Sequence, residues 1–184
     1  PHPLQTIGGT LFGVLYIGLL WNFLTKLLVF GRPPDFAEAI YWPGRWFLLY
    51  AVFAAKFTDI GAYLVGCAIG RHKLIPRISP AKSWEGVIGG IFVGTLAGTL
   101  LVQGLQATPH ALESFGLTPL RAVGLGFVLS VCAVVGDLTE SLFKRAANVK
   151  DSGGIVPGMG GLLDVLDSIL FTAPGVYWFL RLAA

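Results

Sequence analysis

Carboxylate and basic side chains recur at helical spacing in the segment "GDLTESLFKRAANVKDSGGIVPGMGGLLDVLDS", which covers residues 136–168. Residues three, four or seven positions apart lie on one face of an α-helix. Two such faces can be read here: Asp137, Glu140, Ser141 and Lys144 on the first, and Asp164, Asp167 and Ser168 on the second. Carboxylates that converge from two helices beside Lys and Arg are suited to bind a hard cation such as Mg²⁺ together with a phosphorylated substrate.

The same charges could instead pair with one another and only fix the register of the helices. The surroundings favour a functional role, because the segment interrupts a strongly apolar chain. An ionised carboxylate inside a bilayer is costly unless it is paired, hydrated or bound to a cation. Asp59, in the apolar run "AAKFTDIGAYLVG", raises the same question further upstream.

The composition indicates a membrane protein. Of the 184 residues, 54% are hydrophobic and 12% are charged, whereas soluble domains are usually about 25% charged. Five stretches have the length of about 20 residues that a helix needs to cross a bilayer: 7–30, 46–69, 84–106, 120–143 and 161–182. We therefore expect an all-α fold, a polytopic bundle of about five transmembrane helices. The formal charge of +3 is too small to indicate nucleic-acid binding.

No repeat and no soluble domain is visible, so residues 1–184 are interpreted as a single transmembrane domain. The chain does not begin with Met and could be the C-terminal part of a longer one. Basic residues gather in the connections after the second and fourth spans: Arg71, Lys73, Arg77 and Lys82, then Lys144, Arg145 and Lys150. The connection 107–119 has no Lys or Arg. By the positive-inside rule, we expect an inner (cytoplasmic) membrane protein whose active site faces the cytoplasm.

A stripe of small residues marks the third span. Gly86, Gly90, Gly94 and Gly98 recur every four residues and lie on one face of the expected helix. Such a stripe lets a neighbouring helix approach closely. A smooth wall for a lipid tail is the alternative interpretation.

The segment 141–168 resembles the C-terminal signature of the phosphatidate cytidylyltransferases, also called CDP-diacylglycerol synthases. That signature runs Ser-x-x-Lys-Arg, four residues, Lys-Asp, then Pro-Gly-His-Gly-Gly and an Asp-Arg-x-Asp end. The matching residues are Ser141, Lys144, Arg145, Lys150, Asp151, Pro157, Gly158, Gly160, Gly161, Asp164 and Asp167. The block "DIGAYLVGCAIGRHKLIPRISPAKSWEG" resembles the family's Asp-x-Gly-Ala-Tyr and Ser-Pro-x-Lys-Thr-Trp-Glu-Gly motifs. Met159 and Val165 depart from the pattern, which has His and Arg at these places.

The resemblance implies transfer of a cytidylyl group from CTP to phosphatidic acid, giving CDP-diacylglycerol and pyrophosphate for phospholipid biosynthesis. It implies Mg²⁺ as the cofactor, with a second cation left open. CTP, phosphatidic acid and the lipid bilayer are the expected partners, a homodimer is left open, and no nucleic acid is expected. The lipid phosphate is already an anionic nucleophile, so the main barrier is to bring two anions together. Metal neutralisation and positioning should therefore carry most of the catalysis.

Roles for individual residues follow as hypotheses. Asp137 and Asp164 are expected to be the main metal ligands because they lie at the ends of adjacent spans, and Asp167 is expected to be a further ligand or to support them. Together with Lys144 and Arg145, which would clamp phosphate groups, they form the expected catalytic set. The expected substrate contacts are Arg71, Ser79, Lys82, Ser141, Lys150, Asp151, Gly158, Gly160 and Gly161.

Two other functions stay open. One is a related transferase that acts on another lipid phosphate or on a polyprenyl phosphate. The other is an ion-coupled membrane transporter whose carboxylates bind the coupling ion. The basic connections favour the enzyme, and pyrophosphate release that requires both CTP and lipid would distinguish it from a transporter.

Overall fold

The computed structural model describes residues 3–30, 43–106, 117–147, 149, 152–153 and 161–183. Its elements are α1 (Pro3–Val29), α2 (Pro43–Ile69), β1 (Lys73–Ile75), β2 (Ser79–Ser83), α3 (Trp84–Gln106), α4 (Pro119–Ala146) and α5 (Leu162–Ala183). The predicted helical bundle is confirmed, and each helix lies where an apolar stretch predicts it. The helices α1 to α4 are long and apolar enough to cross a membrane, and α5 is a fifth, C-terminal helix.

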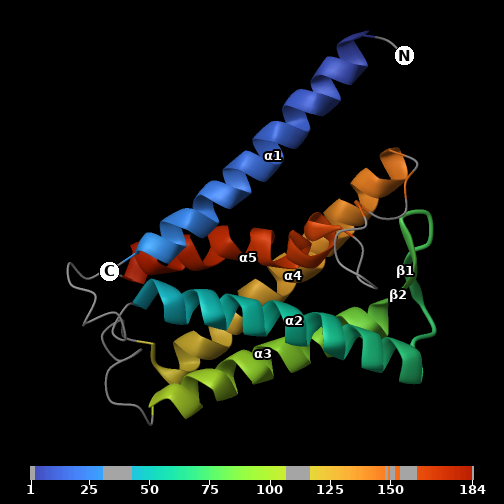
Figure 1. The fold of residues 1–184 in the computed structure, drawn as a ribbon. Coiled ribbons are helices and arrows are strands. Elements are labelled where there is room, and N and C mark those ends of the chain that lie inside the picture. Colours follow the sequence, from blue (N-terminus) through green and yellow to red (C-terminus); the bar gives the residue numbers. More distant parts are fainter. Residues whose placement is uncertain are drawn as a thin grey trace.

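The helices α2 to α5 lie side by side, and α1 leans against the bundle mainly along α5 (Figure 1). The first turns of α1 project beyond the other helices (Figure 1). The hairpin, the end of α4 and the beginning of α5 all lie at one end of the bundle, which we call the hairpin end (Figure 1). The hairpin and the two helix ends that border the second polar connection are thus at the same end of the molecule.

The basic connection between α2 and α3 contains an antiparallel hairpin, an element that the apolar stretches do not predict. Lys73 pairs with Ser83 and Ile75 pairs with Ser79, with an irregularity between the two pairs. The strands are too short for the alternation of apolar and polar residues to predict them. Ser83 ends the hairpin and begins α3, because its hydroxyl accepts a hydrogen bond from the Gly86 amide at 3.2 Å, as an N-cap residue does.

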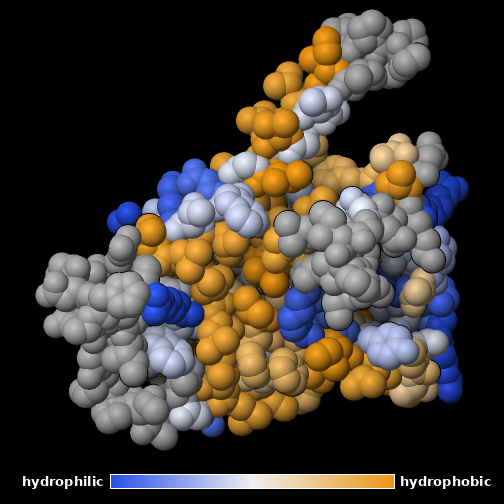
Figure 2. All heavy atoms as spheres, in the orientation of Figure 1, coloured by the Kyte–Doolittle hydropathy of each residue, from blue (hydrophilic) through white to orange (hydrophobic). Residues whose placement is uncertain are grey.

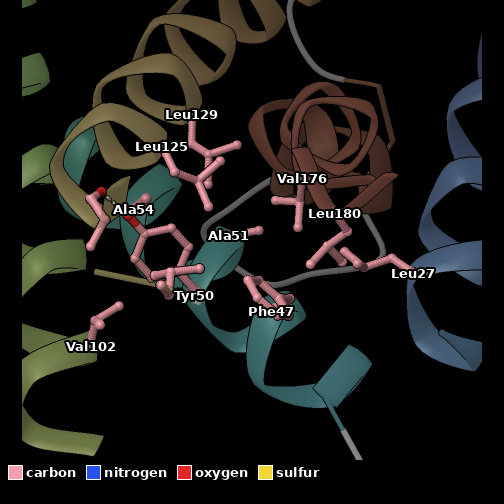
Figure 3. Close-up of a cluster of buried hydrophobic side chains, with 12 residues drawn as sticks. Leu27, Phe47, Tyr50, Ala51, Ala54, Val102, Leu125, Leu129, Val176 and Leu180 are labelled. Carbon is pink, nitrogen blue, oxygen red and sulfur yellow. Dashed lines mark hydrogen bonds between the residues drawn. The ribbon is translucent and has the colours of Figure 1, made fainter. Parts of the chain in front are cut away.

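An apolar core packs between the helices (Figure 3). Its residues come from the helix ends opposite the hairpin. It includes Leu27, Phe47, Tyr50, Ala51, Ala54, Val102, Leu125, Leu129, Val176 and Leu180. The buried Tyr50 hydroxyl donates a hydrogen bond to the Ala122 carbonyl oxygen at 2.7 Å, which ties α2 to α4. Outside the core, apolar side chains cover most of the middle of the face seen in Figure 2, as expected of helices that contact lipid.

The glycine stripe of α3 packs against α2, which confirms the close-packing interpretation. A Cβ atom added at Gly90 would lie 2.6 Å from the Thr58 carbonyl oxygen, and one at Gly98 would lie 3.0 Å from the Tyr50 ring. These distances leave no space for a lipid tail along the stripe. The contact fixes α2 against α3, so the polar residues of α2 hold a set position beside the hairpin.

Candidate active site

Three carboxylates meet between α4 and α5 near the hairpin end. Asp137 and Glu140 come from α4 and Asp167 comes from α5, and one oxygen of each lies within 4.8 Å of the others. We call these three residues the carboxylate cluster. The structure therefore brings together Asp137 and Asp167, as the sequence predicts, and adds Glu140, to which the sequence assigns no ligand role.

Gly136 allows the two helices to approach at this point. A Cβ atom there would lie 2.8 Å from the Asp167 carbonyl oxygen and 3.1 Å from the Phe171 side chain. Both distances are shorter than ordinary contacts, so a larger residue would push α5 away from α4. Gly136 thus allows Asp167 of α5 to lie beside Asp137 and Glu140 of α4.

Glu140 is buried, with 2% of its surface exposed. Its Oε2 accepts a hydrogen bond from Lys144 Nζ at 2.9 Å. Its Oε1 is also buried, and no residue in the described part of the chain donates to it. A buried carboxylate oxygen without a partner is costly, and an oxygen-lined site is what Mg²⁺ prefers. The cluster therefore fits a divalent cation.

Two lysines neutralise part of the negative charge. Lys144 Nζ lies 2.9 Å from Glu140 and 2.8 Å from Asp164, so it joins α4 to α5. Lys82 reaches down from β2 and forms an ion pair with Asp137. Both lysines are predicted substrate or phosphate contacts, and the structure places both of them next to the cluster.

Asp164 lies beside the cluster but is not part of it. Its Oδ1 binds Lys144, and its Oδ2 accepts hydrogen bonds from the Ser152 amide, the Ser152 hydroxyl and the Gly161 amide at 2.9, 2.8 and 2.6 Å. The Ser152 hydroxyl in turn accepts from the Asp164 amide at 3.3 Å. This exchange resembles a capping box in which Ser152 replaces the missing side chain of Gly161. A metal-ligand role for Asp164 stays a prediction, while its present contacts begin α5.

Asp59 is the residue that sequence reasoning leaves without a role. Its Oδ2 lies 3.1 Å from the Ser168 hydroxyl, which also lies 3.0 Å from Asp167 Oδ1. Lys56, one turn earlier on α2, lies 3.7 Å from the same Asp59 oxygen. Ser168 therefore connects α2 to the carboxylate cluster. The signal in the sequence is an Asp inside an apolar span, but it does not reveal which distant residues it meets.

A cavity of about 510 Å³ opens beside the cluster, and we call it the hairpin cavity. It lies between α2, α3, α4 and the hairpin, and its charged lining residues are Asp59, Asp137, Lys73 and Lys82. The small residues Ala62, Gly66 and Gly86 line it on α2 and α3. Its volume lies in the range of small-molecule sites, and its charges suit an anionic ligand that brings a cation.

The hairpin is held against the helices by polar contacts at both ends. Arg145 Nε donates to the carbonyl oxygen of Ile78 in the turn, at 3.2 Å. Glu85 Oε2 accepts from the backbone amides of Arg71 and His72, both at 3.2 Å. Arg145 is thus occupied at the turn of the hairpin rather than at the cluster.

The other predicted substrate contacts are more dispersed. Arg71 is exposed, Ser79 lies in β2 opposite Ile75, and Ser141 is half-buried on α4. None of these three lines the hairpin cavity. Gly161 contributes its amide to Asp164. The remaining predicted contacts, Lys150, Asp151, Gly158 and Gly160, lie outside the described residues, as does Met159, while Val165 lies within α5.

Comparison of the sequence with known protein families identifies the family of this chain. The sequence model of the Cytidylyltransferase family matches residues 3–183. The chain belongs to the cytidylyltransferase family. The carboxylate cluster, both lysines and the described part of the hairpin cavity all lie within the matched range.

Curated members of the cytidylyltransferase family are similar over most of this chain. The phosphatidate cytidylyltransferase of Mycobacterium leprae (strain TN) is 39% identical over 179 residues, which are 97% of this chain and 51% of the relative. Phosphatidate cytidylyltransferase 4, chloroplastic, of Arabidopsis thaliana is 37% identical over 188 residues, which are 95% of this chain and 46% of the relative. The phosphatidate cytidylyltransferase of Staphylococcus aureus (strain COL) is 41% identical over 131 residues, which are 71% of this chain and 47% of the relative. The chain spans about half the length of these relatives.

Proposed function

We propose that this protein transfers a cytidylyl group from CTP to phosphatidate and releases pyrophosphate. The observation that carries the proposal is the carboxylate cluster: one buried Glu140 oxygen has no donor among the described residues, and Asp137 lines a cavity that also contains two lysines. Membership of the cytidylyltransferase family and the names of the similar proteins support the same reaction.

The site has to bring two phosphorylated anions together. Asp137, Glu140 and Asp167 are the residues that would hold Mg²⁺, and the bound ion would neutralise phosphate charge and polarise the phosphoryl group. Lys82 reaches the cluster from the hairpin and can exchange its carboxylate partner for a phosphate oxygen. The phosphate oxygen of the lipid then attacks the α-phosphorus of CTP, the bond to the β-phosphate oxygen breaks, and pyrophosphate leaves.

Lys144 is proposed to position the carboxylates rather than to move between partners. It is held by Glu140 and Asp164 at the same time, so it keeps α4 and α5 in register and partly neutralises Glu140. Ser168 does the same for Asp59 and Asp167. Preorganised charges of this kind act on the reacting phosphates without having to rearrange during the reaction.

The contacts to substrate predicted from the resemblance belong to the same proposal. Arg71, Ser79 and Ser141 would become contacts only for groups that extend beyond the hairpin cavity, because none of them lines it. The hairpin end would face the cytoplasm, where CTP is available, with the lipid substrate supplied by the surrounding bilayer.

A reconstitution assay tests the proposal. The protein is incorporated into phosphatidylcholine vesicles with phosphatidate, labelled CTP and Mg²⁺, and both labelled lipid and pyrophosphate are measured. We expect both products in equal amounts, and only when CTP and phosphatidate are present together. A polyprenyl phosphate that replaces phosphatidate with higher turnover would assign the protein to a related transferase. Transport of solute without consumption of CTP would overturn the proposal.

A further inference from the structure

An aromatic group from three helices lies beside the carboxylate cluster. The Tyr16 ring of α1 lies 5.1 Å from the Phe143 ring of α4 and 5.7 Å from the Phe171 ring of α5, measured between ring centroids. Phe12, one turn before Tyr16, lies 5.4 Å from Phe143. Edge-on and tilted ring contacts at these distances are favourable, so α1 is fixed against α4 and α5 at this level.

The aromatic group is one helical turn away from the cluster. Phe143 follows Glu140 by three residues and Phe171 follows Asp167 by four, so each ring shares a helix face with one carboxylate. The Tyr16 ring contacts both of these rings, so it lies about one helical turn from Glu140 and Asp167. Tyr16 therefore borders the cluster on the side of α1, α4 and α5, whereas the hairpin cavity reaches it from α2, α3 and the hairpin.

The Tyr16 hydroxyl is chemically available. Tyrosine usually places its ring among apolar groups and finds a hydrogen-bond partner for its hydroxyl when it is buried. Tyr16 is half-buried, and no side chain or backbone group in the described part of the chain forms a hydrogen bond with its hydroxyl. A neutral donor next to two carboxylates is suited to an anionic ligand, because it binds phosphate oxygens without pairing with the carboxylates as a lysine does.

The surface around Tyr16 is suited to hydrocarbon. Leu11, Phe12 and Leu15 are exposed large apolar side chains on the same part of α1, and α1 is one of the helices apolar enough to cross a membrane. A ligand that reaches this surface comes from the bilayer. A nucleoside triphosphate is too polar for it and would enter through the hairpin cavity, which Lys73 and Lys82 line.

We propose that Tyr16 is a binding residue for the lipid substrate, and that its hydroxyl donates a hydrogen bond to the phosphate of a lipid phosphate monoester whose acyl chains lie against α1. The proposal rests on the proposed function and adds a residue that neither the motifs nor the carboxylate cluster indicates. Its ring closes the lipid side of the cluster, and its hydroxyl holds the nucleophilic phosphate next to the residues that would hold the cation.

The variant Tyr16→Phe tests the hydroxyl alone, because it keeps the ring contacts with Phe143 and Phe171. We expect the KM for phosphatidate in vesicles to rise about tenfold, which corresponds to about 1.4 kcal/mol, with the KM for CTP unchanged. The matched control is Tyr177→Phe. Tyr177 also packs against α1, with its ring 5.5 Å from Phe23, but lies about 15 Å further along α5 than Asp167. This control should keep both KM values.

Binding is measured as well, so that the test does not depend on turnover. Phosphatidate added to the detergent-solubilised protein without CTP should raise the unfolding temperature of the wild type and of Tyr177→Phe more than that of Tyr16→Phe. Equal stabilisation of all three proteins would overturn the role of Tyr16. So would a rise in the KM for CTP equal to the rise for phosphatidate, or a fall in kcat with both KM values unchanged. A wild type that binds phosphatidate but makes no product would count against the proposed function instead.

Discussion

At the scale of single residues, Glu140 and Asp164 show how similar carboxylates acquire different roles. Both are close to Lys144, but Asp164 has partners for both of its oxygens, whereas Glu140 keeps one buried oxygen without a donor among the described residues. The unpartnered oxygen marks Glu140 as the better candidate to bind a cation. Asp164 is better suited to start α5.

The first prediction concerns Glu140→Gln, which keeps the size of the side chain and removes its charge. We expect the affinity for Mg²⁺ to fall by at least about tenfold, measured both by Mg²⁺ titration of cytidylyl transfer and by the Mg²⁺-dependent rise in unfolding temperature. The control is Thr139→Ala on the same helical turn, whose hydroxyl donates, among the described residues, to the Val135 carbonyl oxygen of its own helix. Unchanged Mg²⁺ affinity in Glu140→Gln would show that the cluster does not hold the ion.

The second prediction separates the two roles of Asp164. Asp164→Asn loses the ion pair with Lys144 and weakens the contacts that begin α5, so we expect the free energy of unfolding to fall by about 1–2 kcal/mol. The affinity for Mg²⁺ should stay close to that of the wild type. The metal-ligand hypothesis from the sequence predicts the opposite pattern, a large loss of Mg²⁺ affinity. Thermal unfolding in detergent and Mg²⁺ titration of the same preparation decide between them.

At the scale of elements, the site depends on how closely α2, α3 and α4 pack. Gly94 lies where the three helices meet, and a Cβ atom there would lie 2.6 Å from the Ser130 hydroxyl and 2.8 Å from the Ala54 carbonyl oxygen. The backbone carbonyl cannot move away cheaply. The Cβ would also meet the hydroxyl of Thr58, the residue before Asp59, so the position of Asp59 at the cluster is coupled to this glycine.

The third prediction is that Gly94→Ala destabilises the protein by about 1–3 kcal/mol, because the added methyl group overfills the contact. Gly104→Ala is the matched control in the same helix, since its Cβ would meet no atom of the described residues within 4 Å. This control should be neutral or stabilise the helix by up to about 1 kcal/mol. Unfolding curves of both variants in the same detergent make the comparison, and equal stability of the two would contradict the packing.

At the scale of the whole molecule, the candidate active site lies at one end of an apolar bundle. The hairpin, the end of α4 and the beginning of α5 lie at this end (Figure 1), and they carry the carboxylate cluster and part of the lining of the hairpin cavity. The apolar core is built from residues of the opposite helix ends. This polarity lets one surface of the bilayer present the site to water while the remaining length of each helix stays in lipid.

The fourth prediction is that the hairpin end faces the cytoplasm, as the positive-inside rule requires. Cys67 and Cys132 are free thiols and would first be removed as Cys67→Ser and Cys132→Ala. In this background Pro76→Cys, in the hairpin turn, should react with a membrane-impermeant maleimide in inside-out vesicles and not in right-side-out vesicles. Leu120→Cys, at the exposed start of α4, should show the reverse. If the two cysteines are labelled in the opposite vesicles, the hairpin end faces away from the cytoplasm and the prediction is wrong.

Helix number and position follow from the sequence, because an apolar run of sufficient length in a membrane has to satisfy its backbone within itself. The glycine stripe predicts a close helix contact for the same local reason. Likewise, the spacing of Asp137 and Glu140 on one helix is visible before folding. These features depend on residues that are neighbours in the chain.

Tertiary structure alone decides which distant residues share the site. It brings Asp167 to Asp137 and Glu140, joins Asp59 to them through Ser168, and turns Asp164 towards Ser152 and Gly161. It also brings Tyr16 of α1 against α4 and α5 and folds the basic connection into a hairpin. The physical reason is that a carboxylate spacing constrains one helix face, whereas the partner across the interface depends on the crossing and rotation of whole helices. Those are set by packing contacts spread along their full length.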